Sequence, residues 1–437
     1  MADTIRFSDV TADVGEANEL RCLGRQLAEL NESIESDINR LLRLFDASLA
    51  SACHPVEAEQ AAEALAHGLR RLWLETAAHE AASVFRSPTE GEAERIARNH
   101  DAFGYERDLQ PETLERRCAG FFSPPPAGWR QDHLIFSSGQ AAMTCALIGL
   151  GRRLAHGRPL RLAHRGAYFE TRSLIRALPF IAEATLMQTA DVVLDEPVCC
   201  DGQFHQIDTS KLFTAAPKAV VFDTTLLGRE DGIDRYLAAL DPDSDQMVLR
   251  VASCLKLLQG GFELANTGIL SVYTRGKHND FAADLRRTRT LTGSGIHLVD
   301  AIALEAPWFL DAGQTDAYTR AVFQHNAALA QAVAENNKRF APISHPSFTG
   351  AAAPFCAFQL AYASPENYDA LEREIVAETA RRKLLLAHGG SFGFRGHRFE
   401  IVKPETGDAP FLRIALGRRG GWSCEGLIAM MSDISRS

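Results

Sequence analysis

The sequence predicts an α/β protein, in which a large domain with a mixed, mostly parallel sheet is followed by an α+β domain and preceded by a helical extension. In the middle of the chain, short apolar stretches alternate with helix-length segments, the pattern of a parallel sheet covered by helices. Before this region, apolar residues recur at three- and four-residue steps. After it, helical and strand-like stretches are mixed. We therefore expect domains at residues 1–100, 101–305 and 306–437.

The first predicted domain is helical from residue 15 to about residue 95. The leucines and isoleucines of LRCLGRQLAELNESIESDINRLLRLF fall on one side of a helix, and VEAEQAAEALAHGLRRLWLETAAHEAASVF continues the pattern. Amphipathic helices of this kind usually pack against other elements. We therefore expect the extension to serve packing or oligomer formation rather than catalysis.

The central domain contains six candidate strands rich in apolar residues. They are LIFSS (134–138), RLAH (161–164), DVVLDE (191–196), AVVFD (219–223), MVLRVAS (247–253) and GILSVY (268–273), and a helix is predicted from about Gly139 to Leu154. Ligands of parallel sheets bind beyond the carboxyl ends of the strands. Asp223 and the turn at residues 137–139 are predicted to lie at that edge.

The C-terminal domain is predicted to be α+β. A long helix is expected within DAYTRAVFQHNAALAQAVAENN, followed by the strand-like FCAFQLAY, a helix around residues 365–381 and a final strand in FLRIALG.

Composition and charge exclude several classes of protein. Hydrophobic residues make up 46% of the chain and charged residues 23%, as in ordinary globular proteins. The net charge of −10 argues against a nucleic acid as the main partner. The nine cysteines are an odd number without zinc-type spacing, so we expect reduced thiols and no metal site. The acidic start lacks a signal-peptide pattern, and no apolar run is long enough to span a membrane, which favours a cytoplasmic protein.

Lys256 is the most informative single residue. It lies in VASCLKLLQGG, where no other charged residue occurs from Val251 to Phe262. A lysine in apolar surroundings can form an imine with a cofactor aldehyde, whereas most lysines are solvated surface residues. Asp223 precedes it by 33 residues, at the end of a strand predicted to be buried. A protonated pyridine nitrogen would be a suitable partner for that carboxylate; a helix N-cap or a structural salt bridge is the alternative.

Two further stretches carry charge-binding features. SSGQAAM follows a strand and opens a helix, so its backbone N–H groups could hold a phosphate, although such joints are common without a ligand. Arg413 lies within the apolar FLRIALG and needs a partner. That partner would be either a substrate α-carboxylate or an internal Asp or Glu. The sequence contains no HExxH, GxSxG or P-loop lysine motif.

Taken in order, these stretches resemble the fold-type I pyridoxal-phosphate (PLP) enzymes, specifically the cystathionine γ-synthase-like family of Cys/Met metabolism, from about Phe103 to the C-terminus. GYERDLQPETLE is similar to the family segment whose Tyr and Arg reach the phosphate of the neighbouring subunit's cofactor, which implies this role for Tyr105 and Arg107. SSGQAAM resembles the family's phosphate-binding turn. The resemblance implies that its cofactor-binding residues are Ser138, Gly139 and Gln140.

The same resemblance assigns roles to the remaining candidates. GAYFET implies that Tyr168 stacks on the cofactor ring, where it is a candidate to assist proton transfer in catalysis. VVFDTT implies that Asp223 is the partner of the pyridine nitrogen. ASCLK implies that Ser253 binds phosphate and that Lys256 forms the Schiff base. In FLRIALG, Arg413 is implied to bind the substrate α-carboxylate, and Ser391 is predicted to contribute to substrate binding.

This chain also departs from the family pattern. Leu255 replaces the threonine that usually precedes the lysine, and Cys199 replaces an asparagine near the cofactor ring. One extra residue separates Lys256 from the pair Gly260–Gly261, and the helical extension is longer than usual. These departures favour a specialised biosynthetic role.

The resemblance implies a PLP-dependent lyase or transferase that acts on an α-amino acid with a leaving group on its γ-carbon. O-acylhomoserines, cystathionine and S-adenosylmethionine are substrates of this type, and the reaction would be γ-elimination or γ-replacement, including C–C bond formation. The active sites would be shared in a homodimer or homotetramer. An aminotransferase or β-lyase on the same fold is the enzymatic alternative, and a non-catalytic scaffold of this fold is the other.

Overall fold

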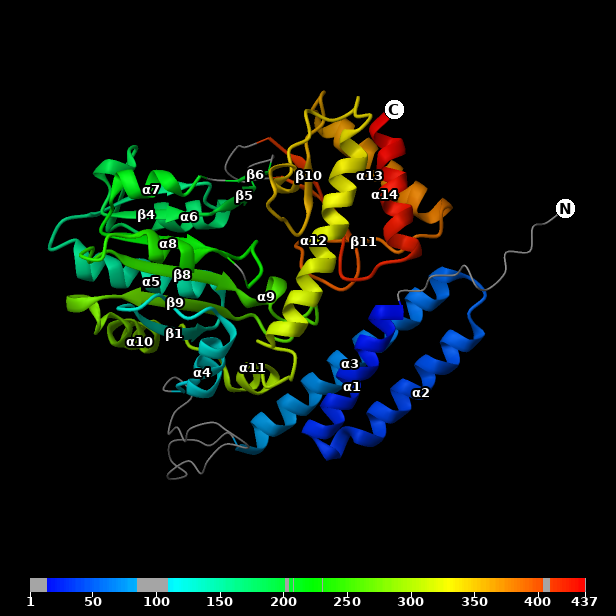
Figure 1. Ribbon diagram of the computed structural model, residues 1–437. Coiled ribbons are helices and arrows are strands. Elements are labelled where there is room, and N and C mark those ends of the chain that lie inside the picture. The colour runs from blue at the N-terminus through cyan, green and yellow to red at the C-terminus, as the bar shows by residue number, and fades with distance from the viewer. Residues whose placement is uncertain are drawn as a thin grey trace. The chain divides into compact units, whose positions relative to one another are not determined.

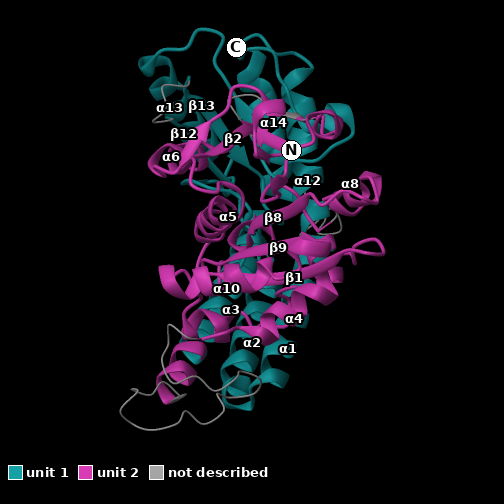
Figure 2. Ribbon diagram, turned by 90° about the vertical axis from the view of Figure 1, so that its left-hand side faces the viewer, with its two compact units in different colours: residues 1–76, 260–262, 317–437 teal, residues 77–259, 263–316 magenta. Residues whose placement is uncertain are grey.

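The computed structural model describes residues 14–84, 109–200, 204–206, 208–229, 231–403 and 409–436 (Figure 1). The chain divides into two compact units (Figure 2). Unit 1 comprises Met1–Thr76, Gly260–Phe262 and Ala317–Ser437, and unit 2 comprises Ala77–Gln259 and Glu263–Asp316. The N-terminal helices therefore belong to the same unit as the C-terminal segment, a grouping that the sequence pattern does not signal.

Unit 2 contains a seven-stranded sheet in the order β1-β9-β8-β7-β4-β2-β3. Its strands are β1 (Arg130–Phe136), β2 (Leu160–Arg165), β3 (Ile181–Glu183), β4 (Val192–Asp195), β7 (Ala219–Asp223), β8 (Met247–Ser253) and β9 (Gly268–Thr274). Only β9 runs antiparallel to its neighbours in this sheet. The predicted mixed, mostly parallel sheet is confirmed, and all six predicted strands are present.

The sheet is buried on both faces because its strands carry apolar side chains on both sides. In β8, Leu249 and Val251 join one core cluster, which includes the helix α5 (Gly139–Leu154), whereas Val248 joins the cluster of the opposite face. Phe222 of β7 lies in that second cluster. Near-continuous apolar runs are typical of parallel strands covered on both faces. This two-sided burial explains why these strands could be predicted from short apolar runs.

The other elements of unit 2 are short. Its helices besides α5 are α4 (Glu112–Phe121), α6 (Phe169–Ala177), α7 (Ser210–Ala215), α8 (Ile233–Ala239), α9 (Cys254–Leu257), α10 (Phe281–Thr292) and α11 (Leu298–Ala303), with the 3₁₀ turns η5 (Met187–Thr189) and η6 (Gly276–His278). A separate hairpin is formed by β5 (Val198–Cys200) and β6 (Phe204–Gln206). The predicted helix from Gly139 to Leu154 is confirmed by α5.

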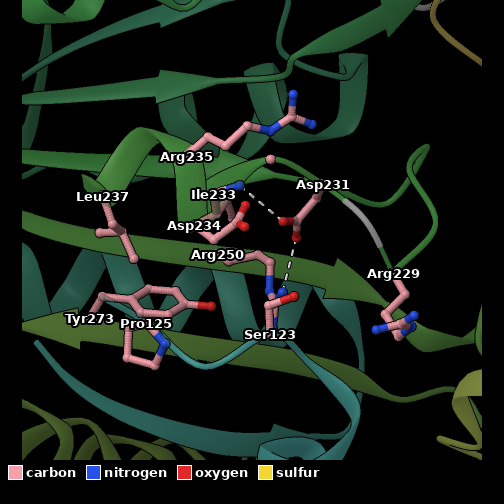
Figure 3. A pocket seen from close by; sticks show the side chains of 11 residues that line it. Ser123, Pro125, Arg229, Asp231, Ile233, Asp234, Arg235, Leu237, Arg250 and Tyr273 are labelled. Carbon is pink, nitrogen blue, oxygen red and sulfur yellow. Dashed lines mark hydrogen bonds and ion pairs between the residues drawn. The ribbon is translucent and has the colours of Figure 1, made fainter. Parts of the chain in front are cut away.

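A cavity of about 160 Å³ lies in unit 2 beside β8 and the start of α8 (Figure 3). Arg250, Asp231 and Tyr273 are among its lining residues. The charge of Arg250 is satisfied inside the protein, because Nη1 donates to Asp231 Oδ2 at 2.9 Å and Nη2 to Ser271 Oγ at 2.7 Å. Among the described residues, none of those predicted to bind cofactor or substrate lines this cavity.

Unit 1 combines helices from both ends of the chain with a four-stranded sheet. The helices are α1 (Val14–Leu30), α2 (Glu35–Ser51), α3 (Pro55–Val84), α12 (Ala312–Ala334), α13 (Pro365–Arg381) and α14 (Trp422–Arg436), with η2 (Glu32–Ile34) and η7 (Pro346–Thr349); α3 and α12 run past the unit boundaries. The sheet order is β10 (Cys356–Phe358), β13 (Phe411–Ala415), β12 (Arg398–Val402) and β11 (Ala387–His388). The predicted α+β character of the C-terminal region agrees with this arrangement.

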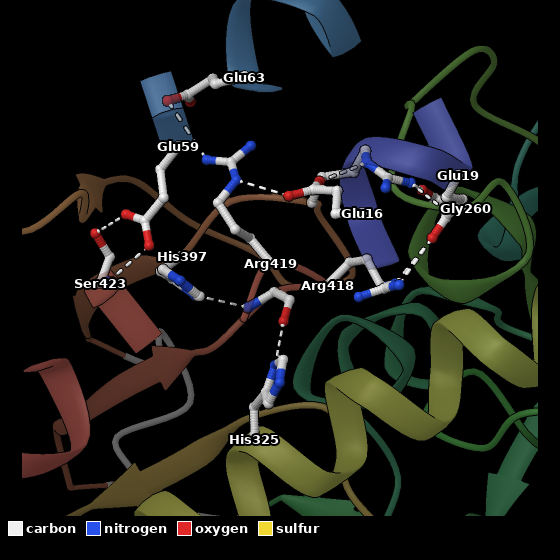
Figure 4. A network of polar contacts seen from close by, with 12 residues as sticks. Glu16, Glu19, Glu59, Glu63, Gly260, His325, His397, Arg418, Arg419 and Ser423 are labelled. Atoms are coloured by element: carbon white, nitrogen blue, oxygen red, sulfur yellow. Dashed lines mark hydrogen bonds and ion pairs between the residues drawn. The ribbon is translucent and has the colours of Figure 1, made fainter. Parts of the chain in front are cut away.

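Buried ion pairs connect α1 to the C-terminal segment within unit 1 (Figure 4). Arg419 Nε donates to Glu16 Oε2 at 2.9 Å, and Arg395 Nε donates to Glu16 Oε1 at 3.1 Å. Glu19 accepts from Arg395 Nη1 at 2.8 Å and from Arg418 Nε at 3.0 Å. Arg419 is 2% exposed and Glu16 is 1% exposed. Charges this deeply buried require partners, so α1 is an integral part of unit 1.

Candidate functional site

The candidate site lies where β7 and β8 end in unit 2. The two strands are parallel, and their register places Asp223 beside Val251, two residues before Ser253. β8 ends at Ser253, and the single turn of α9 that follows carries Lys256, which is partly buried. Asp223 therefore lies at the carboxyl end of its strand, as predicted, and Lys256 lies in the turn that follows the end of the neighbouring strand.

Asp223 is held in place by the residue two positions further on. The Thr225 backbone N–H donates to Asp223 Oδ1 at 3.0 Å. Burial raises the pKa of Asp223 above its ordinary value, against the opposing effect of the hydrogen bonds from Thr225. No cation pairs with this carboxylate among the described residues. A cationic group placed beside Asp223 would therefore be strongly favoured.

Thr225 also links Asp223 to the end of the next strand. Its Oγ1 accepts a hydrogen bond from the Ser253 backbone N–H at 3.0 Å. Thr225 thus fixes both Asp223 and Ser253, although the sequence analysis gave it no role. Its position two residues after Asp223, the acid that ends β7, could have indicated such a role.

The turn between β1 and α5 packs against Ser253. A Cβ atom added to Gly139 would lie 3.0 Å from Ser253 Cβ, and one added to Gly268 would lie 2.3 Å from the carbonyl oxygen of Ser138. Ser138 Oγ accepts from the Ala141 backbone N–H at 3.0 Å and caps α5. The glycines therefore allow three chain segments to meet at the N-terminus of α5, where backbone N–H groups favour an anion.

Gln140 connects this turn to the segment of Tyr168. Its Nε2 donates to Thr171 Oγ1 at 3.1 Å, in the first turn of α6, and Tyr168 immediately precedes that helix. Gln140 Oε1 is buried and has no hydrogen-bond partner in the described part of the chain. This hydrogen bond connects α5 to the segment of Tyr168, and Gln140 Oε1 can accept a further hydrogen bond.

Two further acids lie at the end of β4, and the sequence analysis did not identify them. Asp195 is fully buried, and Arg165 Nε lies 3.0 Å from its Oδ1. Burial raises the pKa of Asp195 to about 6 despite Arg165. Burial, followed by the nearby charges of Asp223 and Asp195, raises the pKa of Glu196 well above its ordinary value. The stretch DVVLDE predicts a strand, but no sequence motif marks the acids at its end as functional.

The two residues predicted to bind substrate lie in unit 1, and both contact Glu400. Arg413 Nη2 forms an ion pair with Glu400 Oε1, and the Ser391 backbone N–H donates to the same oxygen at 3.3 Å. The internal acid that was the alternative for Arg413 is therefore present. Tyr105 and Arg107 lie outside the described residues. Of the departures from the family pattern, Leu255 is partly buried and Cys199 is buried in the β5–β6 hairpin.

The described residues show no sign of a metal site or of a membrane-spanning helix. Within the described ranges, no group of three or more His, Cys, Asp or Glu residues could hold a metal ion. In the same ranges, none of the helices combines the length and the apolar character that crossing a membrane requires.

The chain is similar in fold to solved structures of a cystathionine γ-synthase, a cystathionine γ-lyase and a methionine γ-lyase. No protein-family model matches the chain, and no curated protein matches it in sequence. A cystathionine γ-synthase from Xanthomonas oryzae pv. oryzae in complex with cystathionine superimposes with a TM-score of 0.56 at 18% identity, covering 83% of this chain and 99% of that one. A cystathionine γ-lyase from yeast superimposes with a TM-score of 0.56 at 15% identity, covering 84% of this chain and 98% of that one. A methionine γ-lyase from Micromonospora echinospora superimposes with a TM-score of 0.54 at 18% identity, covering 79% of this chain and 90% of that one. The fold expected from the resemblance is confirmed.

Proposed function

We propose that the chain is a PLP-dependent lyase or transferase that acts on an α-amino acid with a leaving group on its γ-carbon. The observation that carries the proposal is the close approach of Gly139 to Ser253, one turn before Lys256, together with the link from Ser253 through Thr225 to Asp223. These groups match the three parts of PLP: a phosphate, an aldehyde and a pyridine nitrogen. The likeness in fold to cystathionine γ-synthase and γ-lyase supports the assignment.

The phosphate would be held at the start of α5. The backbone N–H groups of Gly139 and Gln140 lie in the first turn of this 16-residue helix, and Ser253 lies against it. A side chain at position 139 would fill the space against Ser253, so the glycine keeps the backbone accessible. Tyr105 and Arg107 are proposed to contribute from a neighbouring subunit of a homodimer or homotetramer.

Asp223 would keep a proton on the pyridine nitrogen. Its raised pKa means that ionisation of the carboxyl is unfavourable unless a positive charge stands beside it. With the pyridine nitrogen protonated, PLP supplies an electron-accepting ring that stabilises negative charge on the substrate carbon atoms. Tyr168 would stack on the ring, and Gln140 fixes the start of α6 that follows it.

Lys256 would bind the cofactor aldehyde and, once released by the substrate amine, move protons. Its amine would take the proton from the substrate α-carbon and then a proton from the neighbouring β-carbon, whose loss allows the γ-substituent to leave.

The finer assignment concerns the substrate. O-acylhomoserine, cystathionine and S-adenosylmethionine all carry an α-amino acid and a γ-leaving group. The solved structures that share this fold include one in complex with cystathionine. We therefore place cystathionine first in a substrate panel, followed by the other two.

The decisive experiment compares the visible absorption of the protein, purified with PLP, for wild type and Lys256→Ala. We expect a lysine-dependent band in the wild type and its loss in the variant. Lys277→Ala is the matched control, because Lys277 lies in unit 2 with a side chain 69% exposed. A band that persists in Lys256→Ala would refute the proposal, and absence of any band in the wild type would favour a non-catalytic scaffold.

Product analysis then separates the enzymatic alternatives. Release of a 2-keto acid with ammonia, or formation of a γ-substituted amino acid, is expected for γ-elimination and γ-replacement. Accumulation of pyridoxamine phosphate would indicate an aminotransferase instead, and release of pyruvate would indicate a β-lyase.

A further inference from the structure

Glu400 contacts Arg413 and Ser391, the two residues that the sequence predicts to bind the substrate. β12 and β13 are antiparallel neighbours, and their register places Glu400 directly opposite Arg413. Glu400 Oε1 accepts from Arg413 Nη2 and from the Ser391 backbone N–H. One guanidinium and one backbone amide are thus engaged by a single internal carboxylate.

The loop segment at Gly390 and Ser391 lies against the Glu400 carboxylate, which extends from β12. A Cβ atom at Gly390 would lie 2.9 Å from Glu400 Oε2, so the glycine permits the acid to lie against the loop backbone. Ser391 has a φ of 75°, in the left-handed region that non-glycine residues rarely adopt. This conformation directs its N–H toward Glu400. Strained backbone of this kind persists where the surrounding structure holds it, and it gathers at ligand-binding sites.

Arg413 retains capacity for a second acceptor. Its Nε is buried and has no hydrogen-bond partner in the part of the chain that the structure describes. The guanidinium lies over the Phe355 ring at 5.3 Å, and Phe355 contacts Phe392 with ring centroids 4.9 Å apart. The aromatic pair holds the guanidinium in place independently of Glu400. A carboxylate that approached Nε would meet the negative charge of Glu400.

We propose that Glu400 is a specificity-determining residue, an internal carboxylate that the substrate α-carboxylate must displace from Arg413 and Ser391. This inference rests on the proposed function. The exchange conserves charge, because one carboxylate leaves the guanidinium as another binds it. Glu400 has a side chain 23% exposed, so it can turn toward solvent. An amine without a carboxylate cannot displace it. The affinity for amino acids is reduced in proportion to the fraction of time that Glu400 is away from Arg413.

The test measures binding of L-norleucine, an α-amino acid without a γ-leaving group, to the PLP-loaded protein by calorimetry. Glu400→Gln keeps the shape of the side chain and removes its charge. We expect the Kd for L-norleucine to fall by about tenfold in this variant. That value corresponds to a wild-type protein in which Glu400 is away from Arg413 roughly a tenth of the time. L-norleucinamide, which has no carboxylate, should bind equally to both proteins. The matched control is Glu374→Gln, which removes a different ion pair of unit 1, that of Arg339 and Glu374 at 2.6 Å.

Combined variants complete the test. Arg413→Gln should abolish the gain, so that Arg413→Gln and the double variant bind L-norleucine equally weakly. Thermal denaturation checks that each variant is folded, and Glu400→Ala serves if Glu400→Gln is not. An unchanged or weaker Kd in Glu400→Gln, or an equal gain for the amide, would overturn the inference while the lysine-dependent absorption band still upheld the proposed function. Loss of that band's dependence on Lys256 would instead refute the function itself.

Discussion

The buried acids Glu16 and Glu19 of unit 1 differ from Asp223 and Glu196, which lie at strand ends in unit 2. In unit 1, Glu16 and Glu19 are paired with arginines, and although burial raises the pKa of Glu19, Arg395 and Arg418 outweigh it and hold the pKa below its ordinary value. In unit 2, Asp223 and Glu196 have raised pKa values because burial is not offset by a nearby cation of comparable effect. Buried acids that are paired with arginines have a structural role, whereas buried acids without a cation of comparable effect indicate a ligand-binding site.

The largest effect is expected from unpairing the network of unit 1. Arg419→Ala leaves the buried Glu16 with one arginine partner fewer, which should lower the free energy of unfolding by about 3–5 kcal/mol. Arg40→Ala is the control, because Arg40 and Asp37 form an exposed pair at 3.0 Å and should contribute less than about 1 kcal/mol. Chemical denaturation measures both. Equal effects of the two variants would mean that the contrast between the units has no energetic basis.

The second prediction concerns the unbalanced acid of unit 2. Asp223→Asn should lower kcat for the amino-acid substrate by about a hundredfold to a thousandfold, because the charge that holds the pyridine proton is lost. The same change should leave the stability of the cofactor-free protein unchanged or higher, since it removes a carboxylate that burial destabilises. Denaturation and steady-state kinetics report the two effects separately. A large loss of stability without PLP would place Asp223 among the structural charges.

The third and smallest effect is a pH dependence. The folded-state pKa of Asp195, about 6, lies above its ordinary value of 3.8, so the folded protein retains a proton that the unfolded chain releases. The resulting stabilisation is present below pH 3.8 and is lost as the pH rises through 6, by roughly 3 kcal/mol in total. In Asp195→Asn this decrease should be absent when unfolding is followed between pH 4 and 7. A decrease as large as that of the wild type would assign the titration to another group, with Glu196→Gln as the next variant to examine.

The sequence predicted the sheet of unit 2 well and the contacts of unit 1 poorly. Runs such as AVVFD are buried on both faces, so their composition alone identifies them as strands. By contrast, β11 has only two residues, and no local pattern signals it. Arg395 and Glu16 are separated by 379 positions, and nothing near either residue indicates its partner.

The candidate site was predictable to the extent that it follows strand ends. Asp223, Ser253 and Lys256 fall at or just after the carboxyl ends of strands, where ligands of such sheets bind. Thr225 was missed because its hydroxyl contacts the end of a different strand, at Ser253, which only the folded sheet brings close. Glu400 was missed because its meeting with Arg413 depends on the register of β12 against β13. Register is fixed by the folded sheet and cannot be read from residue types alone.

The buried pairing of Glu16 with Arg395 and Arg419 has a consequence for the order of events during synthesis. Glu16 leaves the ribosome about four hundred residues before its arginine partners, and all of unit 2 is translated in between. Until the last segment emerges, α1 exposes an apolar face and an acid without a counter-charge. Contacts so distant along the chain form slowly, and nascent chains of this kind are prone to aggregate. Unit 2 is therefore free to fold first, and a chain that lacks its C-terminal segment should depend strongly on chaperones.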